Sequence, residues 1–181
     1  MQGELSFCDI SVSEVRFPMD ASISPPDDVV IRSMRAADLP AIVELDALVN
    51  GQERVEFFQR RLRRDAGHDE SAILLAAFAH DTVIGFVMGE LVYGEFGFTQ
   101  VTGLLDSIAV HPQYARQGIG QRLGAAFISE SARRGAQAVF TLVAWDAWDL
   151  LKFFHALGFS LANSIPLELP IVPPDRQEKG R

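Results

Sequence analysis

Apolar positions in the first part of the chain predict one short strand followed by two helices. The β-branched run Val29–Ile31 is typical of a strand, and the apolar positions between Leu39 and Leu48 recur at helical spacing. A second helix is expected over Gln52–Asp65, where one apolar stripe follows the segment. The rest of that helix carries four arginines, Arg60, Arg61, Arg63 and Arg64. We interpret them as a solvated face, with contact to a substrate as the alternative.

The middle of the chain predicts three consecutive strands and a long helix. Ala72–Ala79 and Thr82–Val92 are rich in apolar and β-branched residues and are separated by two polar residues, a pattern typical of a hairpin. A third strand is expected over Val101–Val110. It ends before Pro112, because proline cannot donate to a β-ladder and disfavours helical geometry in the residue before it. The helix that follows covers about Gly118–Arg134.

The C-terminal part predicts a further strand, a helix and two more strands. The strand is expected over Ala138–Ala144, the helix over Ala147–Leu157, and the last two strands over Phe159–Ala162 and Ile165–Ile171. Antiparallel hairpins and strand–helix–strand crossovers both occur in this order, so the fold class is α/β (α+β). We expect a mixed, mostly antiparallel central sheet of about six to seven strands, with helices on both faces.

Length and composition fit one globular domain, because 181 residues with 48% apolar composition can bury a sizeable core. We divide the chain into an acidic N-terminal leader (1–28), a domain (29–172) and a polar C-terminal tail (173–181). No apolar run is long enough to span a bilayer, and the first residues lack the pattern of a signal peptide. We therefore expect a cytoplasmic protein without a membrane partner. The single cysteine, Cys8, offers no internal disulfide and no metal site.

The net charge of −8 argues against nucleic acid as a partner, since phosphate binding needs a basic surface. The charge is uneven, because residues 1–31 hold six acidic residues and one arginine. Residues 113–134 have the opposite balance, with one acidic residue, Glu130, and four arginines: Arg116, Arg122, Arg133 and Arg134. This basic run is the first indication of an anionic ligand.

Gly118 and Gly120 stand between a predicted strand and the start of a predicted helix. Glycines at a helix N-terminus let the chain approach a ligand closely, and the first helical amides together with the helix dipole favour an anion such as pyrophosphate. A nucleotide-triphosphate loop is excluded because the residues after Gly120 are not Lys-Ser/Thr. The dinucleotide fingerprint fails as well, since Leu123 stands where its third glycine should be.

The run from Ile108 to Gly120, with His111-Pro112 at its turn and Arg116-Gln117-Gly118-Ile119-Gly120 at its end, resembles the acetyl-CoA signature of the GNAT N-acetyltransferase superfamily. Leu157-Gly158-Phe159 resembles the end of the second CoA-side helix of that family. The resemblance covers about residues 29–172. It implies an acetyl-CoA-dependent N-acetyltransferase whose acceptor is a primary amine of a small molecule, an amino-acid derivative or a protein. It implies neither a metal nor a covalent intermediate.

The resemblance also implies where acetyl-CoA binds. Pantetheine would lie in a gap between the strands at 101–110 and 138–144, and the amides of the strand before the glycine loop would pair with it. The implied cofactor-binding residues are Ile108, Ala109, Val110, Arg116, Gln117, Gly118, Ile119, Gly120, Gln121 and Phe154.

Two positions depart from the family pattern. Ala115 stands where the signature has Gln or Arg, and Phe154 stands where a tyrosine often protonates the leaving thiolate. A CoA thiol has a pKa near that of cysteine, about 8.5, so the thiolate can leave without that acid. The same departures leave a second hypothesis open, a non-catalytic CoA-binding or protein-interaction module on this fold.

Asp106 is the first candidate for the catalytic base and Glu90 the second. Several family members place a carboxylate four residues before the position of Val110, and strand alternation predicts that Asp106, Ile108 and Val110 share one face. The alternative is an acidic residue that faces water. We interpret two tryptophans, Trp145 and Trp148, as core residues, with the lining of an acceptor pocket as the alternative. The family often dimerises, so the resemblance allows a homodimer.

Overall fold

The computed structural model describes residues 28–66, 71–94 and 99–171, and five strands form one sheet in the order β1-β2-β3-β4-β5. The strands are β1 (Val29–Ser33), β2 (Ala72–Ala79), β3 (Thr82–Tyr93), β4 (Val101–Val110) and β5 (Ala138–Phe140). Neighbours are antiparallel from β1 to β4, whereas β4 and β5 are parallel. The prediction of a mixed, mostly antiparallel sheet is confirmed, with five strands in the described residues instead of six to seven.

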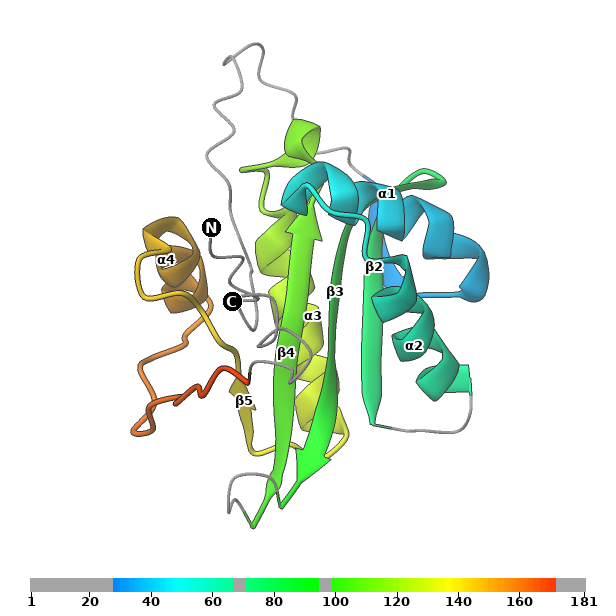
Figure 1. The fold of residues 1–181 in the computed structure, drawn as a ribbon. Coiled ribbons are helices and arrows are strands. Elements are labelled where there is room, and N and C mark those ends of the chain that lie inside the picture. Colours follow the sequence, from blue (N-terminus) through cyan, green and yellow to red (C-terminus); the bar gives the residue numbers. More distant parts are fainter. Residues whose placement is uncertain (1–27, 67–70, 95–98, 172–181) are drawn as a thin grey trace, which may run out of the picture.

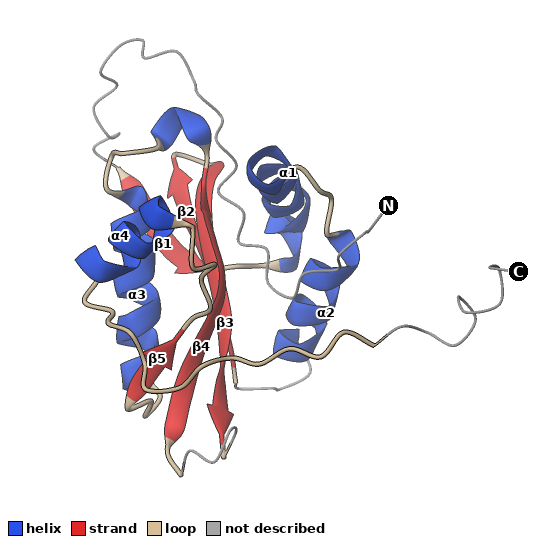
Figure 2. Cartoon of the chain, turned by 60° about the vertical axis from the view of Figure 1, so that its left-hand side comes forward, coloured by secondary structure: helices blue, strands red, loops and turns tan. Residues whose placement is uncertain are grey.

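Helices cover both faces of the sheet, as predicted (Figures 1 and 2). On one face lie α1 (Leu39–Asn50) and α2 (Val55–Ala66), and on the other lie α3 (Ile119–Arg133) and α4 (Trp148–Ala156). Two short 3₁₀ turns, η1 (Ala36–Asp38) and η3 (Pro112–Tyr114), precede α1 and α3. None of the described helices is long and apolar enough to cross a membrane.

Each face of the sheet has its own core. The core under α3 is built around the fully buried side chains of Ile73, Ile84, Leu123 and Phe127. The core under α1 and α2 is built around those of Ile42, Phe58, Phe86 and Met88. Strands β2 and β3 contribute to both cores, so their sequences are nearly continuous apolar runs. The domain therefore consists of a central sheet between two helical layers.

A β-bulge interrupts the pairing of β3 with β4 at the centre of the sheet. Met88 pairs with Ser107 and Gly89 pairs with Leu105, which leaves Asp106 as the extra residue on β4. A bulge places two successive side chains on one face and bends the strand. Gly89 allows this arrangement, since a Cβ there would overlap the carbonyl oxygen of Leu104.

Strands β4 and β5 separate soon after they begin. They pair only over residues 102–104 and 138–140, and β5 ends at Phe140. The predicted strand at Ala138–Ala144 is therefore correct at its start and wrong beyond Phe140, because the edge of β4 that it would need for hydrogen bonds has moved away. The second half of β4 keeps β3 on one side and has no described strand on the other.

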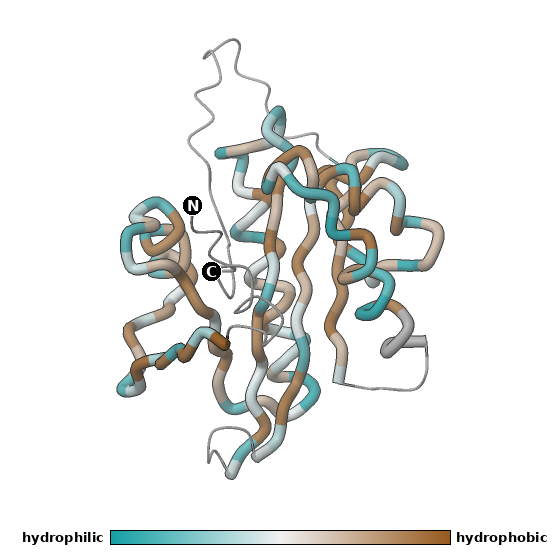
Figure 3. Tube along the Cα trace, in the orientation of Figure 1, coloured by the Kyte–Doolittle hydropathy of each residue, from teal (hydrophilic) through white to brown (hydrophobic). Residues whose placement is uncertain are grey.

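The strands predicted over Phe159–Ala162 and Ile165–Ile171 are wrong, because the described chain after α4 contains no strand. Its large apolar side chains are exposed, Leu167 at 94%, and they recur as hydrophobic positions along the segment in Figure 3. Alternating apolar residues indicate that a segment is suited to a half-buried strand. A strand also needs a neighbouring strand for its hydrogen bonds, and the alternation does not show whether one is available. The predicted tail (173–181) and all but the last residue of the predicted leader (1–28) lie outside the described residues.

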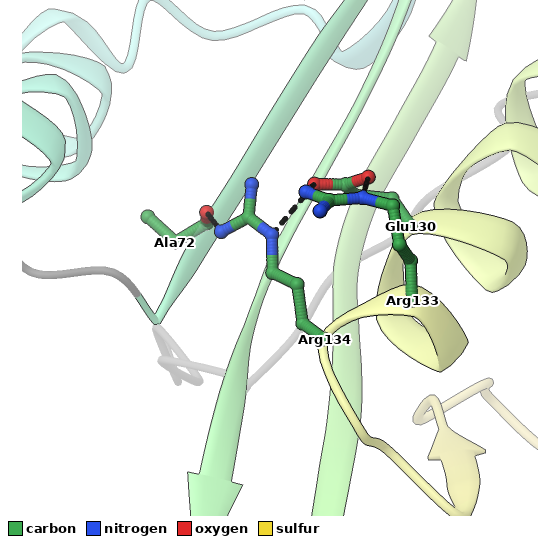
Figure 4. A network of polar contacts seen from close by, with 4 residues as sticks. All are labelled: Ala72, Glu130, Arg133 and Arg134. Carbon is green, nitrogen blue, oxygen red and sulfur yellow. Dashed lines mark hydrogen bonds and ion pairs between the residues drawn. The ribbon is translucent and has the colours of Figure 1, made fainter.

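The C-terminal end of α3 is fastened to the start of β2 (Figure 4). Glu130 accepts hydrogen bonds from Arg133 at 2.7 Å and from Arg134 at 2.6 Å, and Arg134 also donates to the carbonyl of Ala72 at 2.8 Å. The two guanidinium groups lower the pKa of Glu130 to about 2. These arginines lie at the far end of a 15-residue helix, roughly 20 Å from its N-terminus, so the interpretation of residues 113–134 as one basic patch is wrong.

We predict that Gly89→Ala destabilises the domain by about 3 kcal/mol or more, because the new Cβ would collide with backbone and would approach the Phe127 ring to 2.8 Å. Gly51→Ala is the control, since its Cβ would meet nothing within 4 Å and only the left-handed φ of 71° opposes it. Gly51→Ala should cost about 1 kcal/mol. Urea unfolding of both variants tests this, and equal losses would contradict it.

Candidate active site

The loop between β4 and α3 has the geometry of an anion site. His111 accepts a hydrogen bond from the backbone N–H of Gln113 at 3.3 Å and starts the η3 turn. The chain then takes left-handed φ angles at Arg116 (62°) and Gly118 (78°) before the helix begins. Glycine adopts such an angle without strain, whereas an arginine does so only where its surroundings hold it. Arg116 is exposed at this turn.

The first turn of α3 offers backbone donors next to that loop. Its first intrahelical hydrogen bond runs from the N–H of Arg122 to the carbonyl of Gly118, so the N–H groups of Ile119, Gly120 and Gln121 have no acceptor within the helix. These amides and the positive end of the helix dipole favour an anion. Arg122 instead fastens the helix, since its guanidinium donates to the carbonyl of Val29 at 2.7 Å.

The open edge of β4 presents backbone groups to the gap beside β5. The N–H of His111 donates to the carbonyl of Ile84 on β3. The backbone groups of every second residue before it, Ala109 and Ser107, therefore also point toward β3. The backbone groups of Ile108 and Val110 therefore point to the other edge, where the described residues provide no strand. Both predicted residues lie on this edge and directly precede the loop at Gly118.

Asp106 and Glu90 lie on neighbouring strands and share one partner. Arg61 of α2 forms an ion pair with Glu90 at 2.8 Å and a short charge-assisted hydrogen bond with Asp106. The Arg61 side chain is only 17% exposed. The interpretation of the α2 arginines as a solvated face is therefore wrong for Arg61, whereas Arg60, 78% exposed, agrees with it.

Strand alternation gives the wrong face for Asp106. Ile108 and Val110 pack against the core under α3, whereas Asp106 meets Arg61 of α2 on the opposite side of the sheet. The bulge is the physical reason, since its extra residue reverses the alternation between Asp106 and Ile108. The two predicted groups of functional residues therefore lie on opposite faces of the same strand.

The Asp106 carboxyl is largely buried and has a raised pKa. The pKa of this carboxyl is raised to about 6 as the net result of four influences: burial, the largest, raises it, the charge of Arg61 lowers it, that of Glu90 raises it and that of Arg54 lowers it. Arg61 binds Oδ2, while the buried Oδ1 has no hydrogen-bond donor within the described part of the chain. A carboxylate oxygen of this kind is an acceptor in need of a donor.

A buried ion pair lies next to the group formed by Arg61, Glu90 and Asp106. Asp46 of α1 is fully buried and accepts hydrogen bonds from Arg54 at 2.6 and 2.8 Å and from Asn50 at 2.7 Å. The ring of Phe57 has the guanidinium carbon of Arg54 at 5.0 Å and that of Arg61 at 5.7 Å. Together with the group of Arg61, Glu90 and Asp106, this pair forms a charge cluster, which we define as Asp46, Arg54, Arg61, Glu90 and Asp106.

Sequence reasoning missed three members of the charge cluster: Asp46, Arg54 and Arg61. The available signal was the spacing of Arg54, Phe57, Phe58 and Arg61, which repeats every three to four residues on one side of α2. A helix face on which aromatic residues alternate with arginines indicates that the guanidinium groups pack over the rings. A purely hydrophobic stripe gives no such indication.

The remaining predicted residues have mixed outcomes. Phe154 is buried and packs edge to face with Phe153 and Phe159, so its ring is part of the core under α3. Trp145 and Trp148 are 82% and 64% exposed, so their interpretation as core residues is wrong. Within the described ranges, no group of three or more His, Cys, Asp and Glu side chains could hold a metal ion.

We predict that the free energy of unfolding of Asp106→Asn, measured relative to the wild type, is higher at neutral pH than at acid pH. A folded-state pKa near 6, against about 3.9 in the unfolded chain, makes the folded protein bind more protons between those values, so its stability falls as pH rises through them. The variant lacks this penalty. Its stability relative to the wild type should rise by about 2–3 kcal/mol between pH 4 and 7.5 in urea unfolding. A constant difference would refute the buried, raised pKa.

The chain is similar to known proteins in two of three comparisons. A model of the acetyltransferase (GNAT) family matches residues 37–159. A comparison with curated proteins gave no match. Among solved structures, a transcriptional regulator from Bacillus halodurans C-125 is 22% identical, with a TM-score of 0.66 over 80% of this chain and 100% of that one.

Two further solved structures share the fold. The aminoglycoside N-acetyltransferase AAC(6')-Iy, in complex with the bisubstrate analogue CoA-S-monomethyl-acetylneamine, is 18% identical, with a TM-score of 0.67 over 80% of this chain and 99% of that one. The glucosamine-6-phosphate N-acetyltransferase of Arabidopsis thaliana is 14% identical, with a TM-score of 0.65 over 81% and 100%. The family model covers more than half of the sequence, and the chain belongs to the acetyltransferase (GNAT) family.

Proposed function

We propose that this protein transfers the acetyl group of acetyl-CoA directly to a primary amine, with Asp106 as the general base. The observation that carries the proposal is the buried Asp106 carboxylate, whose Oδ1 lacks a described donor and which stands two residues before Ile108 on the open edge of β4. A base poised near neutral pH is thereby placed beside the strand edge that would hold the acyl donor.

The residues present fit acetyl-CoA as the donor substrate. Three amides at the start of α3, the exposed Arg116 and the open space around Gly118 suit its pyrophosphate. The backbone of Ile108 and Val110 suits the amides of pantetheine, which would add to β4 like a further strand. Acetyl-CoA supplies an acetyl group activated as a thioester. A backbone N–H on this edge can also donate to the oxyanion that develops on the acetyl carbonyl.

The chain's own part in the reaction is proton transfer and orientation. Asp106 accepts a proton from the ammonium form of the acceptor, and the neutral nitrogen then bonds to the acetyl carbon as the carbon–sulfur bond breaks. Glu90, on the adjacent strand, contributes a second negative charge that holds the amine. The sulfur leaves as a thiolate, which is tolerable at a thiol pKa of about 8.5, so Phe154 in place of a tyrosine does not prevent the reaction.

The charge cluster favours a cationic acceptor. Its members include three carboxylates, Asp46, Glu90 and Asp106, against two guanidinium groups. An ammonium group would add a positive charge among these carboxylates, whereas an anionic acceptor would bring a further negative charge into a buried site. The relatives that acetylate aminoglycosides or glucosamine-6-phosphate support an amine, and the choice among small-molecule, amino-acid and protein amines stays a prediction.

We expect thiol release from acetyl-CoA in the presence of at least one member of a primary-amine panel, with an acid limb of kcat/KM near pH 6. Asp106→Asn should lower kcat/KM about 100-fold or more above pH 7, because the base is lost, and should abolish the limb. Asp149→Asn is the matched control, since that carboxylate is exposed and pairs only weakly with Lys152.

Calorimetric binding of CoA separates this proposal from a non-catalytic module. Binding with turnover on an amine supports the enzyme. Binding without turnover on any amine, or turnover unaffected by Asp106→Asn, contradicts the mechanism. Failure to bind CoA contradicts both.

A further inference from the structure

The position of Arg61 is unusual for an arginine on a surface helix. Its guanidinium reaches from α2 to two different strands, where it binds Glu90 on β3 and Asp106 on β4. Arg60, one residue away, stays 78% exposed and lies 4.0 Å from Glu56. The chain thus directs one arginine of α2 into the sheet and leaves its neighbour in water.

The packing of α2 fixes where Arg61 can reach. Phe58, one turn earlier, is buried and meets Phe86 of β3 edge to face at 5.6 Å between ring centroids. Residues three apart share a helix face, so the anchor at Phe58 turns Arg61 toward the same strands. The ring of Phe57 flanks the guanidinium at 5.7 Å. Arg61 is therefore held by its helix and by aromatic contact as well as by charge.

We propose that Arg61 is a positioning residue for the acetyl transfer: by bridging Glu90 and Asp106, it holds the Asp106 carboxylate so that Oδ1 is left to receive the proton of the acceptor amine. The inference rests on the proposed function. Arg61 binds Oδ2 of Asp106, and the other oxygen has no donor within the described residues. The planar, forked guanidinium can fix two carboxylates at once, which the single charge of lysine does poorly.

The charges around Asp106 explain why a bridging cation is needed. Glu90 faces Asp106 from β3, Arg61 faces it from α2, and Arg54, which also pairs with Asp46 of α1, adds a weaker positive charge from the start of α2. Without Arg61, Asp106 would lose the opposite charge closest to it, while the negative charge of Glu90 on the adjacent strand would still act on it. Asp106 would then hold its proton to higher pH and lose its fixed orientation.

Kinetics over a pH range test this role. In Arg61→Gln, the acid limb of kcat/KM should move upward by about one to two pH units, because an opposite charge close to Asp106 is removed. At pH 7 this shift should lower kcat/KM by about two- to tenfold, and most of the loss should be recovered at pH 9, while the KM for acetyl-CoA stays within twofold of the wild type. Arg60→Gln, on the exposed side of the same helix, should leave the profile unchanged.

Arg61→Lys keeps the positive charge but not the forked guanidinium group. The acid limb of its kcat/KM profile should therefore stay near that of the wild type, while its kcat falls by a smaller factor than in Arg61→Gln. This variant also serves if Arg61→Gln folds poorly. A loss of equal size at every pH, with an unmoved limb, would mean that Arg61 only supports the structure and would overturn the proposal.

A titration that needs no turnover separates this inference from the proposed function. Carbon-13 NMR of aspartate carboxyls, with Asp106 assigned by its absence in Asp106→Asn, should show its pKa rise by about one unit or more in Arg61→Gln. That rise would support the role of Arg61 in fixing the charge of Asp106 even if no amine is acetylated. An unchanged pKa would overturn it even if the wild type is active.

Discussion

The site depends on one irregularity in hydrogen bonding, the bulge at Asp106. In a regular strand Asp106 would face α3 with Ile108, and no carboxylate of β4 would meet Arg61. With the bulge, one strand presents a carboxylate to the face of α1 and α2 while its next residues turn backbone groups to the open edge. Gly89 makes the bulge possible, since no other residue fits so close to the Leu104 carbonyl.

Burial of charge is the cost that accompanies this arrangement. Three carboxylates and two arginines lie beneath α1 and α2, where an apolar core of equal volume would be at least as stable. The raised pKa of Asp106 expresses that cost, and the same shift brings the group into the range where a base both accepts and releases protons. In contrast, the ion pairs of Glu130 lie at the far end of α3, where Arg134 also connects that helix to β2. They lower the pKa of the Glu130 carboxyl.

The sequence allowed most of the elements to be predicted, because period-two and helical apolar patterns report burial directly. The glycine loop at Gly118 could be interpreted from chemistry alone. The bulge at Asp106 could not, since it arises from pairing between strands and leaves no local pattern. Arg61 was assigned to solvent because a charged residue on a helix is usually exposed, and only the docking of α2 shows otherwise. The segment after α4 has the alternation of a strand but lacks a partner in the described chain.

The two faces of the sheet have a consequence for how such a protein can change over evolutionary time. The loop at Gly118 and the open edge of β4 are held by α3, whereas the charge cluster is held by α1 and α2. The two halves are joined through the strands of the sheet, because β2, β3 and β4 contribute residues to both faces. Under the proposed function, substitutions in α1 or α2 would alter the choice of acceptor amine while the residues proposed to bind acetyl-CoA stay unchanged, so one donor chemistry would be retained while its targets diversify.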